Sequence, residues 1–303
     1  MDKLLGMRTF VTSVEAGSFT AAADRLGVSN KLVSKYVAEL EAQLGVRLMN
    51  RTTRNLGLTD AGRRYHSRCV TLLEEIDELE GSLGEERGTA TGLLRVTAST
   101  TFGELHVARV LRAFQKQHPR LKIDLRLTDR FVDLAREGFD LAIRIGTLGD
   151  STLVARKLAV TELWAVAAPA YLDRTDRPNV PNDLRGHTCL HDTNLRSGRA
   201  WPFRVGDRLS SVPVDAAFAV DSVQAVAALA LEAEGIGLCP DYAVAQLVRS
   251  HKLERVLSGY PSLSLDIHAV FPGSRLMPAK VRLLLDSLSA TFRGEMDWAR
   301  KLD

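Results

Sequence analysis

The chain has 303 residues, of which 45% are hydrophobic and 25% are charged, and its formal net charge at pH 7 is +3. This length predicts two or three domains, and the small net charge excludes a chain that is basic throughout. No apolar run follows Met1 and no segment is long enough to span a bilayer, so we expect a cytoplasmic protein without an export signal or membrane contact. The three cysteines are isolated in the sequence, which is typical of reduced thiols.

Residues 18–44 have the sequence pattern of two helices joined by a tight turn. Ser18 and Ser29 can each cap a helix N-terminus, and Gly27 can adopt the left-handed conformation that ends the first helix. Ala22 and Ala23 are small enough for the second helix to approach closely. This pattern predicts a helix-turn-helix, whose second helix enters the DNA major groove with its N-terminal residues.

The predicted DNA contacts lie on the polar side of that second helix and on the segment after it. Lysine side chains suit guanine edges or phosphates, and an asparagine amide suits adenine. Residues 46–58 contain two short extended runs, and we interpret the turn between them as a wing that contacts phosphates. The predicted contact residues are Ser29, Asn30, Lys31, Ser34, Lys35, Arg51, Thr52 and Arg54. A solvated face on an ordinary surface helix is the alternative, which the turn pattern disfavours.

The basic charge is concentrated on this N-terminal segment. Up to Arg68 the chain has eleven lysine and arginine residues against six acidic residues, a local net charge of +5. Residues 69–90 have one arginine against seven acidic residues, a local net charge of −6. A nucleic-acid footprint is expected to be such a patch, so the charge pattern favours binding of double-stranded DNA.

A long helix is predicted next, with Thr59 as its N-cap. Its apolar residues are spaced by 4, 3, 4, 3 and 4 positions, which is typical of a helix that packs against a partner helix. The predicted dimer contacts are Tyr65, Cys69, Leu72, Ile76, Leu79 and Leu83. A helix packed on its own domain is the alternative, but the surrounding acidic residues leave only a narrow apolar stripe. A dimer would also place two recognition helices on two half-sites of one operator.

Glycine, serine and threonine residues between positions 81 and 92 mark a hinge, and a new domain is expected from Leu93. Strands are predicted at 93–98, 121–127 and 139–145, and helices at 102–117 and 132–138. A second set has strands at 163–168, 189–190 and 235–239 and a helix at 222–234, and residues 265–271 and 279–292 return to the first set. This alternation predicts two α/β lobes joined by crossing strands, with a cleft between them.

Several of these segments resemble the signature motifs of LysR-type transcriptional regulators. The N-terminal matches are residues 22–29, Val33-Ser34, Leu40-Glu41 with Leu44-Gly45-Val46 and Leu48, residues 50–54, and Leu58-Thr59 with Ala61-Gly62. Residues 138–144, 168–172, 235–240 and 278–282 resemble the C-terminal half of the family in the same order. Asn30-Lys31-Leu32 departs from the common family pattern, so base preference cannot be carried over at those positions.

The resemblance implies an N-terminal all-α winged helix-turn-helix with a long linker helix, followed by an α/β two-lobed domain like a type 2 periplasmic-binding protein. We expect the DNA-binding domain at residues 1–59, the linker helix and hinge at 60–91, and the effector-binding domain at 92–303. Lobe I would comprise about 92–162 and 268–303, and lobe II about 163–267. The implied partners are a DNA operator, a small-molecule effector, further copies of the chain as a homodimer and homotetramer, and RNA polymerase.

Ligands of open α/β domains sit at strand ends and helix starts, where free amides favour anions. The predicted effector site is Ser99, Thr100, Thr101, Phe131, Arg144, Trp201, Asp221 and Ser222. The serine and threonine hydroxyls could equally be plain N-caps, and Arg144 could pair with a structural acid instead of facing the cleft. The two aromatic residues could form a wall of the site or belong to the core. We expect a small anionic effector.

Motifs for catalysis are few. The sequence has no Gly-x-Ser-x-Gly elbow, phosphate-binding loop or paired-histidine metal helix, so we expect neither an enzyme nor a cofactor. His187 and His191 flank Cys189, but no fourth ligand is evident and structural roles are favoured over a metal site. The sequence therefore predicts a transcriptional regulator controlled by an effector between two lobes. A solute-binding protein without a transcriptional role is the alternative, and an enzyme built on the same lobes is a third possibility.

Overall fold

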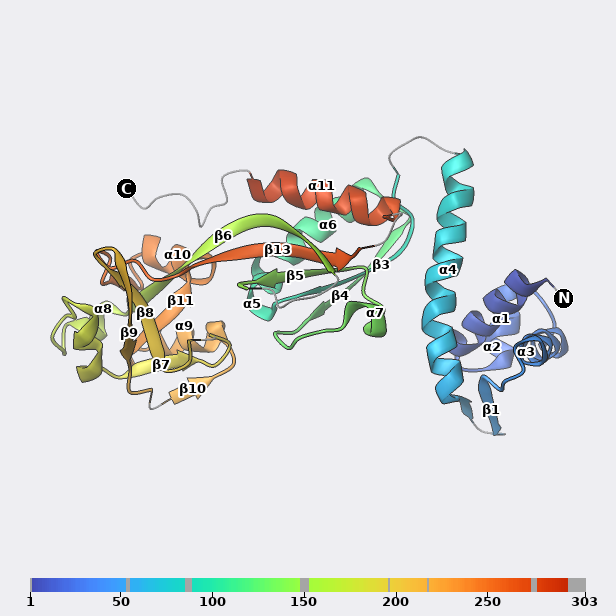
Figure 1. Ribbon diagram of the computed structural model, residues 1–303, viewed down its shortest axis with the longest axis horizontal. Coiled ribbons are helices and arrows are strands. Elements are labelled where there is room, and N and C mark those ends of the chain that lie inside the picture. The colour runs from blue at the N-terminus through green and yellow to red at the C-terminus, as the bar shows by residue number, and fades with distance from the viewer. Residues whose placement is uncertain are drawn as a thin grey trace.

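The computed structural model describes residues 2–52, 55–84, 89–147, 153–195, 197–216, 218–273 and 277–293. Its N-terminal part consists of α1 (Lys3–Ala16), α2 (Phe19–Leu26), α3 (Asn30–Leu44), β1 (Met49–Thr52), β2 (Asn55–Leu58) and α4 (Asp60–Gly84). Figure 1 shows this part at one end of the molecule, where the long α4 stands between the first three helices and the C-terminal sheet. None of the helices in the described ranges is both long enough and apolar enough to cross a membrane.

The turn between α2 and α3 has the geometry that the sequence predicts. The Ser18 hydroxyl oxygen accepts a hydrogen bond from the Ala21 N–H at 3.1 Å, and the Ser29 hydroxyl oxygen accepts one from the Leu32 N–H at 3.3 Å. Gly27 follows α2 with a φ of 66°, which is the left-handed conformation that glycine adopts without strain. The predicted helix-turn-helix is therefore confirmed.

Buried apolar side chains hold the three short helices together. Ala22 and Val33 are fully buried in one cluster, and Phe10, Val37 and Leu40 are fully buried in another. Burying a valine, leucine or phenylalanine side chain stabilises the fold by roughly 1.5–3 kcal/mol. An isolated helix of the length of α2 is unstable in water, so this packing and not helix propensity maintains it.

The wing is fixed to the helices at the segment that enters β1. One carboxylate oxygen of Glu41 accepts hydrogen bonds from the N–H groups of Leu48 at 2.8 Å and Met49 at 3.0 Å. The Thr59 hydroxyl oxygen accepts the Gly62 N–H at 2.9 Å and so caps α4, as predicted. A Cβ atom at Gly62 would lie 2.0 Å from the Leu48 carbonyl oxygen, so only glycine permits α4 to begin this close to the wing.

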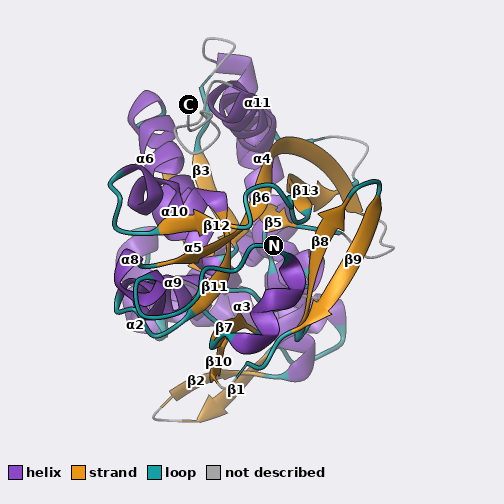
Figure 2. Ribbon diagram, turned by 90° about the vertical axis from the view of Figure 1, so that its left-hand side faces the viewer, coloured by secondary structure: helices purple, strands orange, loops and turns teal. Residues whose placement is uncertain are grey.

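The C-terminal part is a two-lobed α/β structure. Lobe I contains β3 (Gly92–Ala98), β4 (Leu121–Leu127) and β5 (Leu141–Ile145) with α5 (Thr100–Phe102), a π-helical turn (Gly103–Val107), α6 (Ala108–Gln117), α7 (Leu134–Glu137) and α11 (Ala279–Arg293). Lobe II contains β7 (Cys189–Asp192), β10 (Phe218–Val220), β11 (Ile236–Pro240) and β12 (Glu254–Val256) with α8 (Pro169–Leu172), a 3-10 turn (Pro181–Gly186), α9 (Val223–Leu231) and α10 (Asp241–Arg249). Figure 2 shows β8 (Ala200–Val205) and β9 (Arg208–Pro213) as a separate two-stranded ribbon.

Two long strands connect the lobes. β6 (Leu153–Ala167) pairs antiparallel with β13 (Ser264–Pro272), and its second half pairs with β11 of lobe II. β13 also pairs with β5 of lobe I, so the hydrogen-bonded strand order is β10-β7-β11-β6-β13-β5-β3-β4, with β12 on β6. Figure 1 shows β6 and β13 running side by side from one lobe to the other. The predicted pair of lobes with crossing strands is therefore confirmed.

A buried lysine anchors α11 to lobe I. Lys280 is 2% exposed, its ammonium group donates to the Leu93 carbonyl oxygen at 2.9 Å, and it lies 3.9 Å from the Asp140 carboxylate. Asp140 also accepts the Arg95 N–H at 2.8 Å. Burial raises the pKa of Asp140, and the nearby Lys280 opposes that rise. The C-terminal helix thus returns to lobe I, as the sequence predicts.

Several elements differ from the predicted ones. The single helix expected at 102–117 is divided into α5, the π-helical turn and α6. β6 begins at Leu153, well before the strand expected from residue 163. The first half of the strand was missed because charged side chains interrupt its apolar pattern. Two of them, Arg156 and Lys157, pair with Asp286 at 3.1 Å and Asp266 at 2.5 Å. Neither α10 nor the β8–β9 ribbon is among the elements that the sequence pattern predicts.

Candidate DNA-binding face and effector cavity

The N-terminal half of α3 presents polar side chains to solvent. Lys31 and Lys35 are exposed, Ser34 is half-buried between them, and Ser29 caps the helix. The Lys35 ammonium lies 3.8 Å from the Glu39 carboxylate, but an exposed ion pair one helical turn apart stabilises a helix by only about 0.5 kcal/mol. Both lysines therefore remain available to a polyanion.

The other predicted DNA contacts are Asn30 and the residues of the wing. Asn30 is exposed, but its amide nitrogen donates to the Thr20 hydroxyl of α2 at 3.0 Å, so part of its hydrogen-bonding capacity is used inside the motif. Arg51 and Thr52 lie on β1 next to the turn of the hairpin. Arg54 lies outside the described residues.

The first part of the predicted dimer stripe packs inside its own domain. Cys69 is fully buried in the N-terminal core, and Tyr65 is half-buried at the same core, with its ring centroid 5.9 Å from that of Phe10. The prediction that Cys69 contacts a partner is wrong, because its side chain has no surface left to offer. A heptad pattern does not distinguish a partner helix from the chain's own core, and here α1 packs against the start of α4.

The second part of the stripe lies beyond this core. Leu72 is 47% exposed and Ile76 is half-buried. The side chains of Leu79 and Leu83 lie outside the described residues. An exposed leucine on a 25-residue helix leaves apolar surface that a partner helix could cover.

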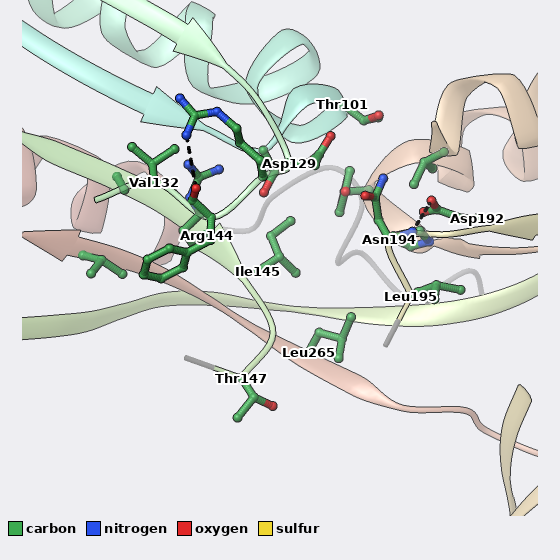
Figure 3. Close-up of a pocket in the computed structure, with 18 of the residues that line it drawn as sticks. Thr101, Asp129, Val132, Arg144, Ile145, Thr147, Asp192, Asn194, Leu195 and Leu265 are labelled. Atoms are coloured by element: carbon green, nitrogen blue, oxygen red, sulfur yellow. Dashed lines mark hydrogen bonds between the residues drawn. The ribbon is translucent and has the colours of Figure 1, made fainter. Parts of the chain in front are cut away.

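A cavity of about 260 Å³ lies between the two lobes. Its polar lining includes, from lobe I, Ser99, Thr101, Asp129, Arg130, Arg144 and Thr147, and from lobe II, Asp192, Asn194 and Tyr242. Its apolar lining includes Val132, Ile145, Leu195, Val223 and Leu265. Figure 3 shows Arg144 and Val132 on one side and Asp192, Asn194 and Leu195 on the other, with Asp129 and Thr101 between them.

Four of the predicted effector residues line this cavity: Ser99, Thr101, Phe131 and Arg144. Ser99 is half-buried and Thr101 is only 6% exposed, whereas Phe131 lies at the rim and is 80% exposed. Ser99 precedes α5 without capping it, and no hydrogen bond joins the Ser99 or the Thr101 hydroxyl to another residue within the described ranges. Both hydroxyls are therefore available to a ligand.

The other four predicted effector residues do not line the cavity, and each has a structural role. The Thr100 N–H donates to the Asp129 carboxylate at 3.1 Å. Trp201 is fully buried in the core of lobe II, which is the more common place for a large aromatic side chain. The Ser222 hydroxyl caps α9, and the Asp221 carbonyl oxygen accepts a hydrogen bond from the Asn194 amide at 2.9 Å.

Arg144 faces the cavity from β5, although part of its guanidinium is occupied. One nitrogen donates to the Thr128 carbonyl oxygen and another to the Thr97 hydroxyl at 3.1 Å. Burial lowers the pKa of Arg144, and the nearby Asp129 carboxylate raises it. Arginine remains protonated in proteins, so Arg144 keeps a positive charge at the cavity wall.

Two carboxyl groups in the cavity were not predicted. Asp129 follows β4 and Asp192 ends β7, so both lie at the carboxyl ends of parallel strands, where ligands of such sheets bind. Asp192 is 2% exposed and accepts the Asn194 N–H at 3.0 Å. Burial raises the pKa of Asp192 to about 6, and the Asp129 and Asp221 carboxylates contribute to that rise. The strand-end rule that selected Ser99 could have identified these acids too.

The residues considered for a metal site have other contacts. The His187 imidazole Nδ1 lies 3.2 Å from the Tyr171 hydroxyl, and the Cys189 thiol donates to the Leu184 carbonyl oxygen at 3.7 Å. Burial raises the pKa of Cys189 to about 12, so the thiol is inert at neutral pH. In the part of the chain that the structure describes, no group of three or more His, Cys, Asp or Glu side chains could hold a metal ion.

Two family models match the chain. "Bacterial regulatory helix-turn-helix protein, lysR family" matches residues 4–63, and "LysR substrate binding domain" matches residues 87–293. An HTH-type transcriptional repressor of Pseudomonas aeruginosa is 37% identical over 96% of this chain and 93% of its own length. An HTH-type transcriptional regulator of Xanthomonas campestris pv. campestris is 36% identical over 95% of this chain and 85% of its own length.

A solved structure has the same arrangement of parts. The full-length structure of the Vibrio cholerae virulence activator AphB matches with a TM-score of 0.62 and 27% identity, over 95% of this chain and 99% of that chain. The relatives are regulators, which removes the solute-binding alternative. The chain belongs to the LysR family of bacterial transcriptional regulators, with an N-terminal DNA-binding helix-turn-helix and a two-lobed C-terminal effector-binding domain.

Proposed function

We propose that this regulator recognises its operator with the N-terminal half of α3 and with the wing, and that a small effector in the inter-lobe cavity controls this binding. The proposed DNA contacts are Ser29, Asn30, Lys31, Ser34, Lys35, Arg51, Thr52 and Arg54. The observation that carries the proposal is the exposure of Lys31 and Lys35 at the end of α3 that enters the major groove in this motif.

The acting unit is proposed to be a homodimer that further assembles into a homotetramer. The contact would be made by the part of the α4 stripe beyond the N-terminal core, at Leu72, Ile76, Leu79 and Leu83. The same residues of a second copy would pack against it, which gives self-complementary pairing about a two-fold axis. The proposed domain limits remain 1–59, 60–91 and 92–303. Two copies would present two recognition helices to two operator half-sites.

The chain is proposed to act by binding and not by catalytic turnover. The similar proteins are named as transcriptional regulators, and this supports a binding role. A regulator of this kind would work in the cytoplasm, where the chromosome is, and would alter transcription through contact with RNA polymerase. The named repressor and activator among the similar proteins show that the direction of regulation differs between them.

Selection of duplex DNA by the full-length protein tests the proposal. The protein would be mixed with a random duplex library, and the retained sequences would be enriched and read over several rounds. We expect a two-fold symmetric consensus, and an affinity for it that falls with rising salt with a log–log slope of about −0.9 for each phosphate contacted. Retention of no consensus sequence, or binding without salt dependence, would contradict the proposal.

A further inference from the structure

The charged groups of the inter-lobe cavity are arranged with opposite signs on its two sides. Figure 3 shows Arg144 on one side, Asp192 on the other, and Asp129 between them. Arg130 also lines the cavity, but its guanidinium pairs with the Glu137 carboxylate through two hydrogen bonds, one of them at 2.8 Å. The Arg130–Glu137 pair adds no net charge, so the net charge that faces a ligand comes from one arginine and two aspartates, which favours a ligand that brings a positive group.

The two aspartates come from different lobes and share this cavity. Each accepts one backbone N–H: Asp129 that of Thr100 at 3.1 Å, and Asp192 that of Asn194 at 3.0 Å. A carboxylate has about four acceptor sites, so both retain capacity for a further donor. The two carboxylates line one cavity and therefore repel each other when both are ionised, and Asp129 accordingly raises the pKa of Asp192. A cationic donor between them would offset this repulsion.

The opposite side of the cavity supplies donors for an anion. Arg144 uses two of its five N–H donors on described residues, Thr128 and Thr97. The Thr101 hydroxyl is part of a side chain that is only 6% exposed, lines the cavity and has no hydrogen-bond partner within the described ranges. The hydroxyl group is open to the cavity, so it can donate a hydrogen bond to a bound carboxylate.

We infer that the effector is a small zwitterion of the amino-acid type with an apolar side chain, and this inference rests on the proposed effector role of the cavity. Its ammonium group lies between Asp129 and Asp192, its carboxylate lies at Arg144 and Thr101, and its side chain contacts apolar residues such as Ile145 and Leu195. A simple anionic effector, which the sequence predicts, would add negative charge to a cavity that already holds more acidic than free basic groups.

Two matched sets of probes separate the charge classes on one apolar body. The first set is leucine, isocaproate and isoamylamine, and the second is phenylalanine, phenylpropionate and phenethylamine, with both enantiomers of each amino acid. Each compound is titrated into the full-length protein by calorimetry at neutral pH. We expect at least one amino acid to bind, and its acid and amine analogues to bind about 10-fold more weakly or worse, because each leaves one side of the cavity unpaired.

Three variants assign the binding to the cavity. Asp192→Asn keeps an acceptor for the Asn194 N–H and removes the charge, so it should weaken the amino acid about 10-fold and leave the acid analogue unchanged or tighter. Arg144→Gln should weaken both the amino acid and the acid analogue. Asp173→Asn changes an exposed residue of lobe II that does not line the cavity, and it should change neither.

The outcomes separate this inference from the proposed function. Binding of an acid analogue as tight as that of its amino acid, binding by neither amino acid, or equal binding to wild type and Asp192→Asn would each overturn the zwitterionic class. If the DNA selection still yields an operator, the regulatory function stands and only the effector class is wrong. Failure of the DNA selection would instead contradict the proposed function, whatever the cavity binds.

Discussion

Single residues of α3 carry the proposed recognition of DNA. Replacing Lys31, Ser34 or Lys35 with alanine should weaken operator binding by roughly 1–3 kcal/mol where a base contact is lost. Gel-shift titration of each variant measures the loss, and thermal unfolding checks that the fold is intact. Lys116→Ala is the matched control, since it removes an exposed lysine from α6 in lobe I. Operator affinity equal to wild type in all three α3 variants would remove this face from the account.

Asp192 predicts a pH-dependent effect on stability. Its pKa of about 6 in the folded chain is above the unfolded value of about 3.9, so its contribution to stability is present below pH 4 and is lost as the pH rises through 6. Asp192→Asn should therefore unfold with a free energy about 3 kcal/mol higher than wild type at pH 7.5, and the difference should vanish near pH 4. Urea unfolding across this pH range measures it. A difference that is constant with pH would show that burial does not shift the pKa of Asp192, and Asp173→Asn provides the exposed control.

Residues that act through local rules could be predicted from the sequence. Ser18, Ser29 and Gly27 follow from capping and turn geometry, which depend on the nearest few residues. That Asp129 and Asp192 line one cavity could not be predicted in the same way, because the two acids lie 63 positions apart and share the cavity only when the lobes are assembled. Hydroxyl groups at helix starts were ambiguous, and of these Thr101 lines the cavity whereas Ser222 is a cap.

At the scale of elements, α4 predicts where copies of the chain meet. The double variant Leu72→Glu and Ile76→Glu would place charges in an apolar contact without partners, at a cost of about 3–5 kcal/mol. Because Leu72 is 47% exposed in the single chain, the fold itself should tolerate the change. Sedimentation velocity should show a smaller species than wild type, whereas Arg64→Glu, on the same helix but off the stripe, should not. A double variant that sediments like wild type would place the contact elsewhere.

The start of α4 predicts a second effect on an element. Gly62→Ala places a Cβ atom 2.0 Å from the Leu48 carbonyl oxygen, which is backbone and cannot rotate away. Alanine stabilises a helix by about 1 kcal/mol relative to glycine. A net loss of stability would therefore show that the clash outweighs the higher helix propensity of alanine. We expect a loss of about 1–3 kcal/mol in urea unfolding. Gly57→Ala, where nothing lies within 4 Å of the added atom, should have little effect, and a Gly62→Ala protein as stable as wild type would contradict the close approach.

The elements themselves could be predicted where their apolar pattern was regular. The strands β3, β4 and β13 and the helix α11 were found within one or two residues of their observed bounds. The first half of β6 could not be predicted, because its charged residues form ion pairs with α11 and β13, which are remote in sequence. The apolar stripe of α4 was predicted, but the part of it that the chain's own core covers depends on the packing of α1. The periodicity of the sequence does not encode that packing.

At the scale of the whole molecule, the proposed DNA-binding face and the cavity are separate. α3 lies at one end of the chain's fold, and the cavity lies between lobes that β6 and β13 connect (Figure 1). An effector that contacts both lobes binds most tightly at one spacing of the lobes. It can shift the equilibrium between two arrangements of the lobes only as far as its affinities for those two arrangements differ. Coupling between the cavity and α3 is thus a property of the assembled molecule, and no single motif in the sequence predicts it.

One measurement tests the central claim most directly: operator occupancy and transcription, recorded together in cells of the source organism. Three proteins would be compared, namely wild type, the cavity variant Thr101→Val with Arg144→Gln, and the helix variant Lys31→Ala with Lys35→Ala. Chromatin immunoprecipitation gives occupancy, and transcript levels are read with and without a probe amino acid that binds the purified protein. The account predicts that the helix variant loses occupancy at the operator under both conditions. The cavity variant should keep the occupancy that wild type has without the probe, and it should lose the changes in occupancy and transcription that the probe causes. Full occupancy by the helix variant, or an unchanged response in the cavity variant, would contradict the account.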